Sequence, residues 1–228
     1  SRDPGGVSKL WLTASGGPFR TRPASTFGEI TVEEALNHPT WRMGRKISID
    51  SATLMNKALE IIEAHWLFGI PGDRIDVVVH PQSVVHSMVE FKDGTVLAQL
   101  GRTDMRIPIQ YALTYPEVWD TPLQPMDLGT AFSLGFEPPD HARFKSLGLA
   151  QEALARGGTT PAAMNAANEV AVQAFLDGEI PFPGITEIVS DVVLKHVPKE
   201  AATIEAVLAA DRAARALART ACFALHPA

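Results

Sequence analysis

The sequence has 228 residues, of which 46% are hydrophobic and 20% are charged. This balance is typical of a chain that buries a core, and it excludes disorder and collagen-like repetition. The 26 acidic and 20 basic residues give a formal net charge of −6, and no cluster of Lys and Arg suits a phosphate backbone, so no nucleic-acid partner is expected. No apolar run approaches the ~20 residues of a membrane span, so no membrane partner is expected either.

The single cysteine and the first residue bear on compartment and completeness. Cys222 cannot form an internal disulfide, which favours a reducing compartment, and no secretory signal opens the chain. The chain begins with Ser1 instead of Met, which indicates a piece of a longer protein.

The first stretch of the chain predicts a strand, a loop and a short helix. Residues 9–13 form an apolar run that predicts a buried strand, and small and turn-forming residues at 14–18 interrupt it. Thr31 and Glu34 have the spacing of a capping box, which predicts a short helix ending near Asn37. A loop at 40–44 follows.

The next stretch carries the most informative pattern. Residues 46–50 alternate like a strand, and 51–68 predict one helix of about five turns closed by Gly69. One side of this helix is apolar and predicts a core seam: Leu54, Met55, Leu59, Ile61, Ile62 and Trp66. The opposite side is polar, with Asn56, Glu60 and Glu63, and Lys57 at its edge. Further strands are predicted at 75–79, 83–91 and 96–100, the last two as a hairpin.

The composition changes in the second half. A Pro-rich linker is predicted at 115–140, and 141–228 is Ala-rich, with four helical blocks at 142–156, 161–177, 184–196 and 202–221. The predicted fold class is α+β: an α/β domain with a mixed sheet at 1–114, followed by a small all-α four-helix bundle.

Two places are candidates for holding an anion. At Ser15-Gly16-Gly17, glycines let the backbone approach a ligand closely and a hydroxyl lies beside amide N–H groups, although a plain tight turn has the same composition. Ser51 lies at the predicted strand-to-helix junction, where a helix N-terminus offers N–H donors; it equally suits the N-cap of that helix.

The polar face beside this junction combines an amide, an ammonium and a carboxylate. Asn56 and Glu60 are one helical turn apart, and Lys57 reaches the same side. These groups suit a phosphorylated, hydroxylated ligand, with the carboxylate available for a divalent metal. Because Mg²⁺ usually needs more than one carboxylate, Glu60 alone is an incomplete site, and a solvated face with a Lys57–Glu60 pair is the alternative.

The histidines divide into two groups. His80 and His86 lack further ligands at zinc spacing, so they are interpreted as core or hydrogen-bonded histidines. His38, close to Trp41 and Met43 in a predicted loop, is a candidate phosphate contact or general acid, or else a surface histidine.

Four segments together carry a family resemblance. They are LTASGGPFR at 12–20, HPTWRMGRKIS at 38–48, Asp50-Ser51-Ala52-Thr53 through Asn56-Lys57 to Glu60, and HPQSVVHS at 80–87. In this order and spacing they closely resemble the 1-deoxy-D-xylulose 5-phosphate reductoisomerase family, and the resemblance covers essentially the whole chain.

The resemblance implies an activity and its cofactors. That family converts 1-deoxy-D-xylulose 5-phosphate to 2-C-methyl-D-erythritol 4-phosphate in isoprenoid biosynthesis, by a rearrangement followed by reduction. It implies NADPH and Mg²⁺ or Mn²⁺, with Co²⁺ also possible, a phosphorylated sugar as substrate, a homodimer for the full-length enzyme and a cytoplasmic location. Residues 1–114 would then be the catalytic, substrate-binding domain, N-terminally incomplete.

The resemblance also implies roles for individual residues. It makes Glu60, Lys57 and His38 catalytic and Glu60 a metal ligand. Trp41 and Met43 match the flap that closes over substrate, and Gly44 matches a position near the cofactor. The residues implied to bind substrate are Ser15, His38, Ser51, Asn56, Lys57 and Glu60.

The sequence departs from the family in one respect. No G-x-G-x-x-G fingerprint follows an opening strand, and no Asp-Ser-Glu motif, which supplies the family's other two metal carboxylates, precedes Ser15. We therefore expect a C-terminal portion that lacks the NADPH-binding domain and is inactive alone. The alternative is a non-catalytic phosphosugar-binding or interaction module derived from that enzyme; an unrelated isomerase with converged spacing is disfavoured by the four ordered motifs.

Overall fold

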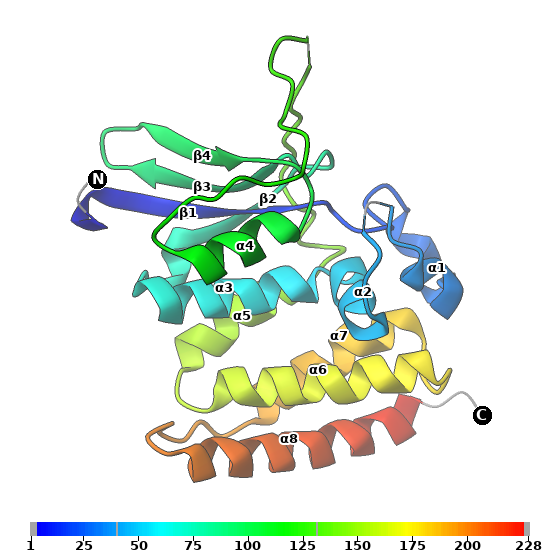
Figure 1. Ribbon diagram of the computed structural model, residues 1–228. Coiled ribbons are helices and arrows are strands. Elements are labelled where there is room, and N and C mark those ends of the chain that lie inside the picture. Colours follow the sequence, from blue (N-terminus) through cyan, green and yellow to red (C-terminus); the bar gives the residue numbers. More distant parts are fainter. Residues whose placement is uncertain (1–3, 40, 131, 226–228) are drawn as a thin grey trace.

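The computed structural model describes residues 4–39, 41–130 and 132–225 and has the α+β class expected from the sequence (Figure 1). A four-stranded mixed sheet lies over layers of helices. Its strands, in spatial order, are β2 (Ile75–Val79), β1 (Val7–Ala14), β3 (Val85–Phe91) and β4 (Val96–Leu100). All four predicted strands of this sheet are confirmed. Thr40, part of the loop predicted at 40–44, lies outside the described residues.

The pairing of β1 fixes the polarity of the sheet. β1 runs parallel to β2, with Leu12 opposite Val77, and antiparallel to β3, with Leu12 opposite Ser87. β3 and β4 form the predicted hairpin, and all five residues of β4 are exposed along its length. Because β1 and β2 are parallel, the chain must cross over between them, and that crossover carries α1 (Val32–Leu36), α2 (Arg45–Ala52) and α3 (Met55–Phe68).

The crossover helices correct two predictions. The strand expected at 46–50 is wrong, because these residues form most of α2. The single helix expected at 51–68 is also wrong: α2 ends at Ala52, Leu54 adopts a left-handed conformation with φ of 58°, and α3 then begins at Met55. The predicted helix at Thr31 is confirmed, with a complete capping box between Thr31 and Glu34.

The apolar seam expected along 51–68 is mostly confirmed. Leu54, Met55, Ile61 and Ile62 are buried, and Leu59 packs against the core. Trp66 is an error in that prediction, since it is 70% exposed near the end of α3. One helix, α4 (Arg106–Thr114), was not expected from the sequence; it lies in front of the sheet (Figure 1).

The four C-terminal helices are confirmed, with small shifts at their ends. They are α5 (Ser146–Arg156), α6 (Thr160–Leu176), α7 (Phe182–Lys195) and α8 (Ile204–Leu225). α6 packs against α5, α7 and α8, and α8 forms the layer farthest from the sheet (Figure 1).

One buried apolar cluster joins the two halves of the chain. Phe182 of α7 meets Phe19 edge-to-face at 5.2 Å and Phe27 at 5.9 Å, and Phe144 lies 5.8 Å from Phe27. The division at 1–114, 115–140 and 141–228 stays a prediction, and the two halves share this core.

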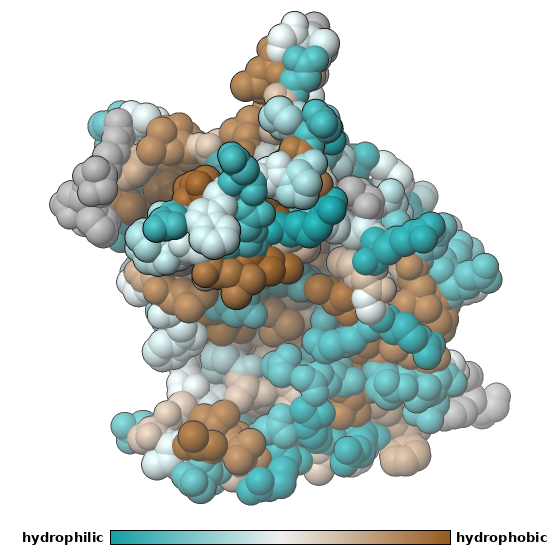
Figure 2. Space-filling model, viewed as in Figure 1, coloured by the Kyte–Doolittle hydropathy of each residue, from teal (hydrophilic) through white to brown (hydrophobic). Residues whose placement is uncertain are grey.

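The surface carries apolar and polar regions. Apolar side chains gather at the β3–β4 hairpin and around α4, where Leu97 and Ile109 are each 53% exposed (Figure 2). Across the helices of the described residues, none combines the length and apolar character that a bilayer span requires.

Candidate active site

The predicted site residues converge on one cleft of about 550 Å³. Its walls come from the loop after β1, the segment before α2, the last turn of α2, the first half of α3 and the start of β3. The structure brings all but one of the predicted site residues to this cleft: Ser15, His38, Trp41, Met43, Ser51, Asn56, Lys57 and Glu60.

The loop after β1 presents the Ser15 hydroxyl at one wall. Gly16 and Gly17 have φ angles of 88° and 66°, which side-chain-bearing residues rarely adopt, and the Gly17 N–H donates to Ser15 Oγ at 3.3 Å. A Cβ on Gly17 would lie 2.6 Å from the Ser51 carbonyl oxygen. The glycine therefore lets this loop approach the end of α2, which places Ser15 and Ser51 in the same cleft.

His38 connects the Ser15 loop to the segment before α2. Its Nδ1 accepts a hydrogen bond from the Trp41 N–H at 3.0 Å, and its Nε2 lies 3.2 Å from Ser15 Oγ. An Nδ1 that accepts carries no proton, so the neutral ring carries its proton on Nε2 and donates it to Ser15. Burial lowers the pKa of His38, which favours this neutral form.

Ser51 reaches the cleft from the last turn of α2 and not from a strand-to-helix junction, so both the predicted junction and the alternative of an N-cap are wrong. The helix N-terminus beside the cleft is that of α3, three residues after the end of α2. Thr53 holds the break between the two helices, because its Oγ1 donates to the Ile49 carbonyl and accepts from the Met55 N–H.

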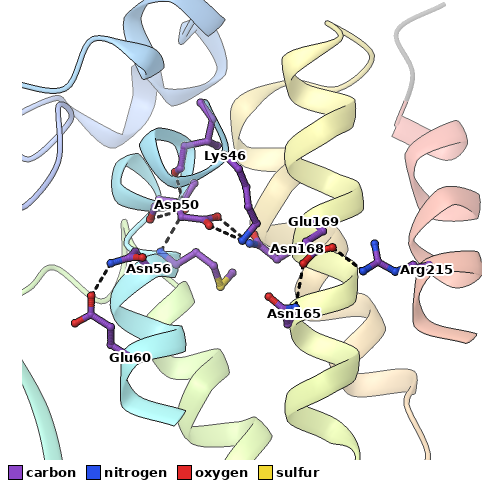
Figure 3. A network of polar contacts seen from close by, with 11 residues as sticks. Lys46, Asp50, Asn56, Glu60, Asn165, Asn168, Glu169 and Arg215 are labelled. Carbon is purple, nitrogen blue, oxygen red and sulfur yellow. Dashed lines mark hydrogen bonds and ion pairs between the residues drawn. The ribbon is translucent and has the colours of Figure 1, made fainter. Parts of the chain in front are cut away.

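The first two turns of α3 carry the amide, ammonium and carboxylate. Asn56 Nδ2 donates to Glu60 Oε1 at 2.6 Å, and Lys57 Nζ donates to Glu60 Oε2 at 2.5 Å. The side chains of Lys57 and Glu60 are 17% and 33% exposed. Figure 3 shows Asn56 and Glu60 together on this face. The ammonium and the free end of the helix both favour an anion here.

The described residues offer an incomplete donor set for a divalent metal. They contain no group of three His, Cys, Asp or Glu side chains placed to hold an ion. Glu60 is a half-buried carboxylate in the cleft, and Glu63 lines the same cleft from the next turn. Since Mg²⁺ is held through several oxygen ligands, these residues fit one contribution to a metal site and not a whole one.

Some residues that line the cleft were not predicted as site residues. His86, interpreted there as a core or hydrogen-bonded histidine, lies near the Ser83 carbonyl at 3.1 Å and also lines the cleft, as does Met105. His86, Met105 and Trp41 also line an adjoining, mostly apolar cavity of about 590 Å³. His86 lies in the segment at 80–87 that carries the family resemblance, and this could have pointed to it, but nothing in the pattern singles out Met105.

Two other residues lie apart from the cleft lining. Gly44 caps the start of α2 and its carbonyl accepts from Ser48, so its predicted place near a cofactor stays a prediction. His80 is fully buried, between the Gly135 carbonyl and the Val84 N–H, which confirms its interpretation as a hydrogen-bonded core histidine.

Family models match most of the chain. One, described as the DXP reductoisomerase C-terminal domain, matches residues 100–217, more than half of the sequence. The chain belongs to the 1-deoxy-D-xylulose 5-phosphate reductoisomerase family. A second model, described as the 1-deoxy-D-xylulose 5-phosphate reductoisomerase C-terminal domain, matches residues 1–68, which include the predicted site residues.

Curated relatives carry the same name. The 1-deoxy-D-xylulose 5-phosphate reductoisomerase of Cupriavidus metallidurans is 60% identical over 210 residues, which are 92% of this chain and 54% of the relative. That of Symbiobacterium thermophilum is 59% identical over 217 residues, 95% of this chain and 56% of the relative. The chain thus spans about half the length of these relatives.

Solved structures of the family share the fold. The reductoisomerase from Zymomonas mobilis in complex with NADPH superposes with a TM-score of 0.89 at 46% identity, over 96% of this chain and 56% of that one. A DOX-P reductoisomerase in complex with NADPH, fosmidomycin and magnesium gives a TM-score of 0.90 at 44% identity, with the same coverage.

Proposed function

We propose that this chain carries the substrate cleft of a 1-deoxy-D-xylulose 5-phosphate reductoisomerase, which forms 2-C-methyl-D-erythritol 4-phosphate with NADPH and Mg²⁺ or Mn²⁺. One observation carries the proposal: residues from separate segments, singled out by the sequence, line a single cleft. The relative solved with NADPH, fosmidomycin and magnesium supports the same ligands for this site.

The phosphate of the substrate binds between the hydroxyls and the start of α3. Ser15 and Ser51 offer hydroxyl donors, and Asn56 and Lys57 offer an amide and an ammonium beside a helix N-terminus. Hydrogen bonds to charged groups are worth about 1.5–3 kcal/mol each, so a few such donors hold a phosphate on a protein whose net charge is −6.

The reacting end of the sugar lies toward Glu60 and the flap. When bound, the divalent ion supplies a Lewis acid for the oxygens that gain negative charge, and NADPH supplies the hydride. Glu60 would contribute one carboxylate to the ion, and Lys57, which donates to that carboxylate, would keep a positive charge beside it. Trp41 and Met43 line the cleft, and closure of this flap would exclude water from it.

The His38 ring sets the position of the flap relative to the Ser15 loop. With its proton on Nε2, the ring donates to Ser15 and leaves that hydroxyl free to donate to a ligand oxygen. We assign His38 this orienting part and a contact with the substrate.

The enzyme is proposed to act as a cytoplasmic homodimer. An exposed edge strand, β4, offers unpaired backbone groups to a second chain, which supports dimerisation. The one cysteine, Cys222, is buried as a free thiol, which supports a reducing compartment.

Calorimetric titration of the chain with fosmidomycin in the presence of Mg²⁺ tests the cleft. Lys57→Ala should weaken binding at least about tenfold, because it removes a charged donor. Lys92→Ala is the matched control, since Lys92 is exposed in the β3–β4 turn and far from the cleft lining; its affinity should equal that of wild type. A folded wild-type chain that does not bind, or a Lys57→Ala variant that binds normally, overturns the proposal.

The same samples distinguish a portion of a reductoisomerase from a non-catalytic phosphosugar-binding module. With 1-deoxy-D-xylulose 5-phosphate, Mg²⁺ and NADPH, we expect the chain alone to bind the sugar phosphate without oxidising NADPH, because its described residues supply an incomplete metal site. NADPH oxidation at the rate of the full-length relatives would contradict that expectation. If the longer protein that carries this chain also fails to oxidise NADPH, the site is a phosphosugar-binding module.

A further inference from the structure

One face of α2 lines the cleft, and an adjacent face contacts α6. Ile47 and Ser51, one turn apart, line the cleft. Lys46 and Asp50, also one turn apart, lie on the adjacent side, where Asp50 meets Asn168 of α6 (Figure 3). A rotation of α2 about its axis would therefore move both pairs together.

Asp50 is a buried carboxylate whose two oxygens are both used. Its side chain is 3% exposed; Oδ2 accepts from Lys46 Nζ at 2.7 Å, and Oδ1 accepts from Asn168 Nδ2 at 2.8 Å. A carboxylate only accepts, so the amide nitrogen of Asn168 must face it and the orientation of that amide is determined. Burying such a group is costly unless its hydrogen bonds are made.

Asn168 has no evident role other than this contact. It is fully buried, and within the described part of the chain its Oδ1 is one of three buried side-chain atoms that lack a hydrogen-bond partner. A residue that only filled space here would be apolar, as Ala166, Ala167 and Ala171 around it are. Asn168 Nδ2 thus donates to the Asp50 carboxylate, 118 positions earlier in the sequence, while its own Oδ1 has no hydrogen-bond partner, which is a cost to stability.

The neighbouring contacts show what this bond controls. Ser51 follows Asp50 directly, and a Cβ added to Gly17 of the Ser15 loop would lie 2.6 Å from the Ser51 carbonyl oxygen. At the other end, α2 begins at the Gly44 cap, immediately after the flap residues. The helix thus has the flap at one end and a cleft hydroxyl at the other, and Asn168 anchors it from the core.

We propose that Asp50 and Asn168 are positioning residues that fix the rotation of α2 and thereby hold Ser51, and the base of the flap, in the geometry that binds ligand. The ligand part of this inference rests on the proposed function. Asp50 and Asn168 touch no substrate, because neither lines the cleft.

A charge-swap series tests the pair. Asn168→Asp places two carboxylates face to face and should weaken fosmidomycin affinity of the chain by about tenfold. The double variant Asp50→Asn with Asn168→Asp restores an amide-to-carboxylate bond in reverse and should recover most of that loss. If Asn168→Asp does not fold, Asn168→Ala adds no charge and should show the same loss of affinity.

A matched control lies one turn earlier on the same helix. Asn165 donates to Glu169 at 3.2 Å, so Asn165→Asp also sets a new carboxylate against an existing one, but at the α8 side of α6 (Figure 3). Asn165→Asp should change the thermal midpoint without changing fosmidomycin affinity.

Two readouts separate positioning from a merely structural role. Positioning predicts a loss of affinity together with a shifted backbone amide resonance of Ser51, and recovery of both in the double variant. A lower thermal midpoint with unchanged affinity and an unchanged Ser51 resonance overturns it. If the wild-type chain does not bind fosmidomycin, the proposed function fails, while the Ser51 resonance in Asn168→Asp still decides the positioning of α2.

Discussion

His38 Nε2 lies 3.2 Å from Ser15 Oγ, and this contact ties the loop after β1 to the segment that leads into α2. The other ring nitrogen accepts from the Trp41 N–H. One neutral imidazole therefore holds two walls of the cleft, and a second proton on the ring would remove the acceptor that Trp41 uses.

Stability should fall as the pH is lowered below about 6.5. Burial lowers the pKa of His38 from its ordinary 6.5, so the unfolded chain binds a proton that the folded chain does not. The stability that the neutral ring contributes is fully present above that ordinary value and is lost as the pH falls toward the lowered pKa. Thermal midpoints measured from pH 8 to pH 5.5 check this expectation.

His196 provides an internal comparison for that experiment. Its pKa is also lowered, first by burial and then by the charges of Arg156 and Lys199. His38→Gln and His196→Gln should each flatten the pH dependence, and the double variant should flatten it further. Only His38→Gln should change fosmidomycin affinity, since His196 lies far from the cleft lining. An unchanged slope in both single variants would contradict the assignment.

Local rules account for the elements that were predicted correctly. The apolar run of β1, the capping box at Thr31 and the β3–β4 turn each depend on residues adjacent in sequence, so the sequence contains the whole signal. Local patterns made Ser15, Ser51 and Lys57 candidate site residues, but no local pattern shows that they share a cavity. Only the resemblance carried by the ordered motifs joined them in one site.

The errors come from contacts that a short window cannot show. Residues 46–50 alternate in polarity, which favours a strand, whereas the Lys46–Asp50 and Asp50–Asn168 bonds favour the helix. Leu54 was placed inside a helix because it continues the apolar side of 51–68. It adopts a left-handed conformation instead, which is rare for leucine and which Thr53 and the core stabilise. α4 was not predicted, and its apolar side chains are largely exposed in the structure, as at Leu113.

Gly17→Ala should disturb both the fold and the cleft. A left-handed alanine costs about 1–2 kcal/mol, and its Cβ would meet the Ser51 carbonyl oxygen at 2.6 Å, so the Ser15 loop and α2 must separate. Urea unfolding should show a loss of at least about 1 kcal/mol, with weaker fosmidomycin binding. Gly28→Ala is the control, because nothing lies within 4 Å of its added Cβ. Equal stability of the two variants would show that the loop tolerates the side chain.

Thr31→Ala should destabilise the chain without affecting the ligand. Thr31 Oγ1 accepts from the Glu34 N–H and the Glu34 carboxylate accepts from the Thr31 N–H, so the variant loses one half of a capping box. Loss of a Thr N-cap costs about 1 kcal/mol. Urea unfolding measures the loss of stability, and calorimetric titration with fosmidomycin on the same samples measures the affinity. A fall in fosmidomycin affinity would mean that α1 takes part in positioning His38.

Glu60→Gln should remove the effect of a bound metal ion on the affinity for fosmidomycin. If Glu60 contributes a carboxylate to the metal, Mn²⁺ should raise the fosmidomycin affinity of the wild-type chain by about fivefold or more, and chelation with EDTA should remove the gain. The glutamine keeps one oxygen acceptor for Asn56 or Lys57 but lacks the negative charge that a hard cation requires. Binding without metal should therefore persist in Glu60→Gln, while the gain in affinity from Mn²⁺ disappears.

Glu63→Gln, on the next turn of α3 and at the same cleft, is the control and should keep the gain in affinity from Mn²⁺. Loss of the gain in Glu63→Gln alone would move the ligand role from Glu60 to Glu63, and an equal gain in both variants would remove both residues from the metal site.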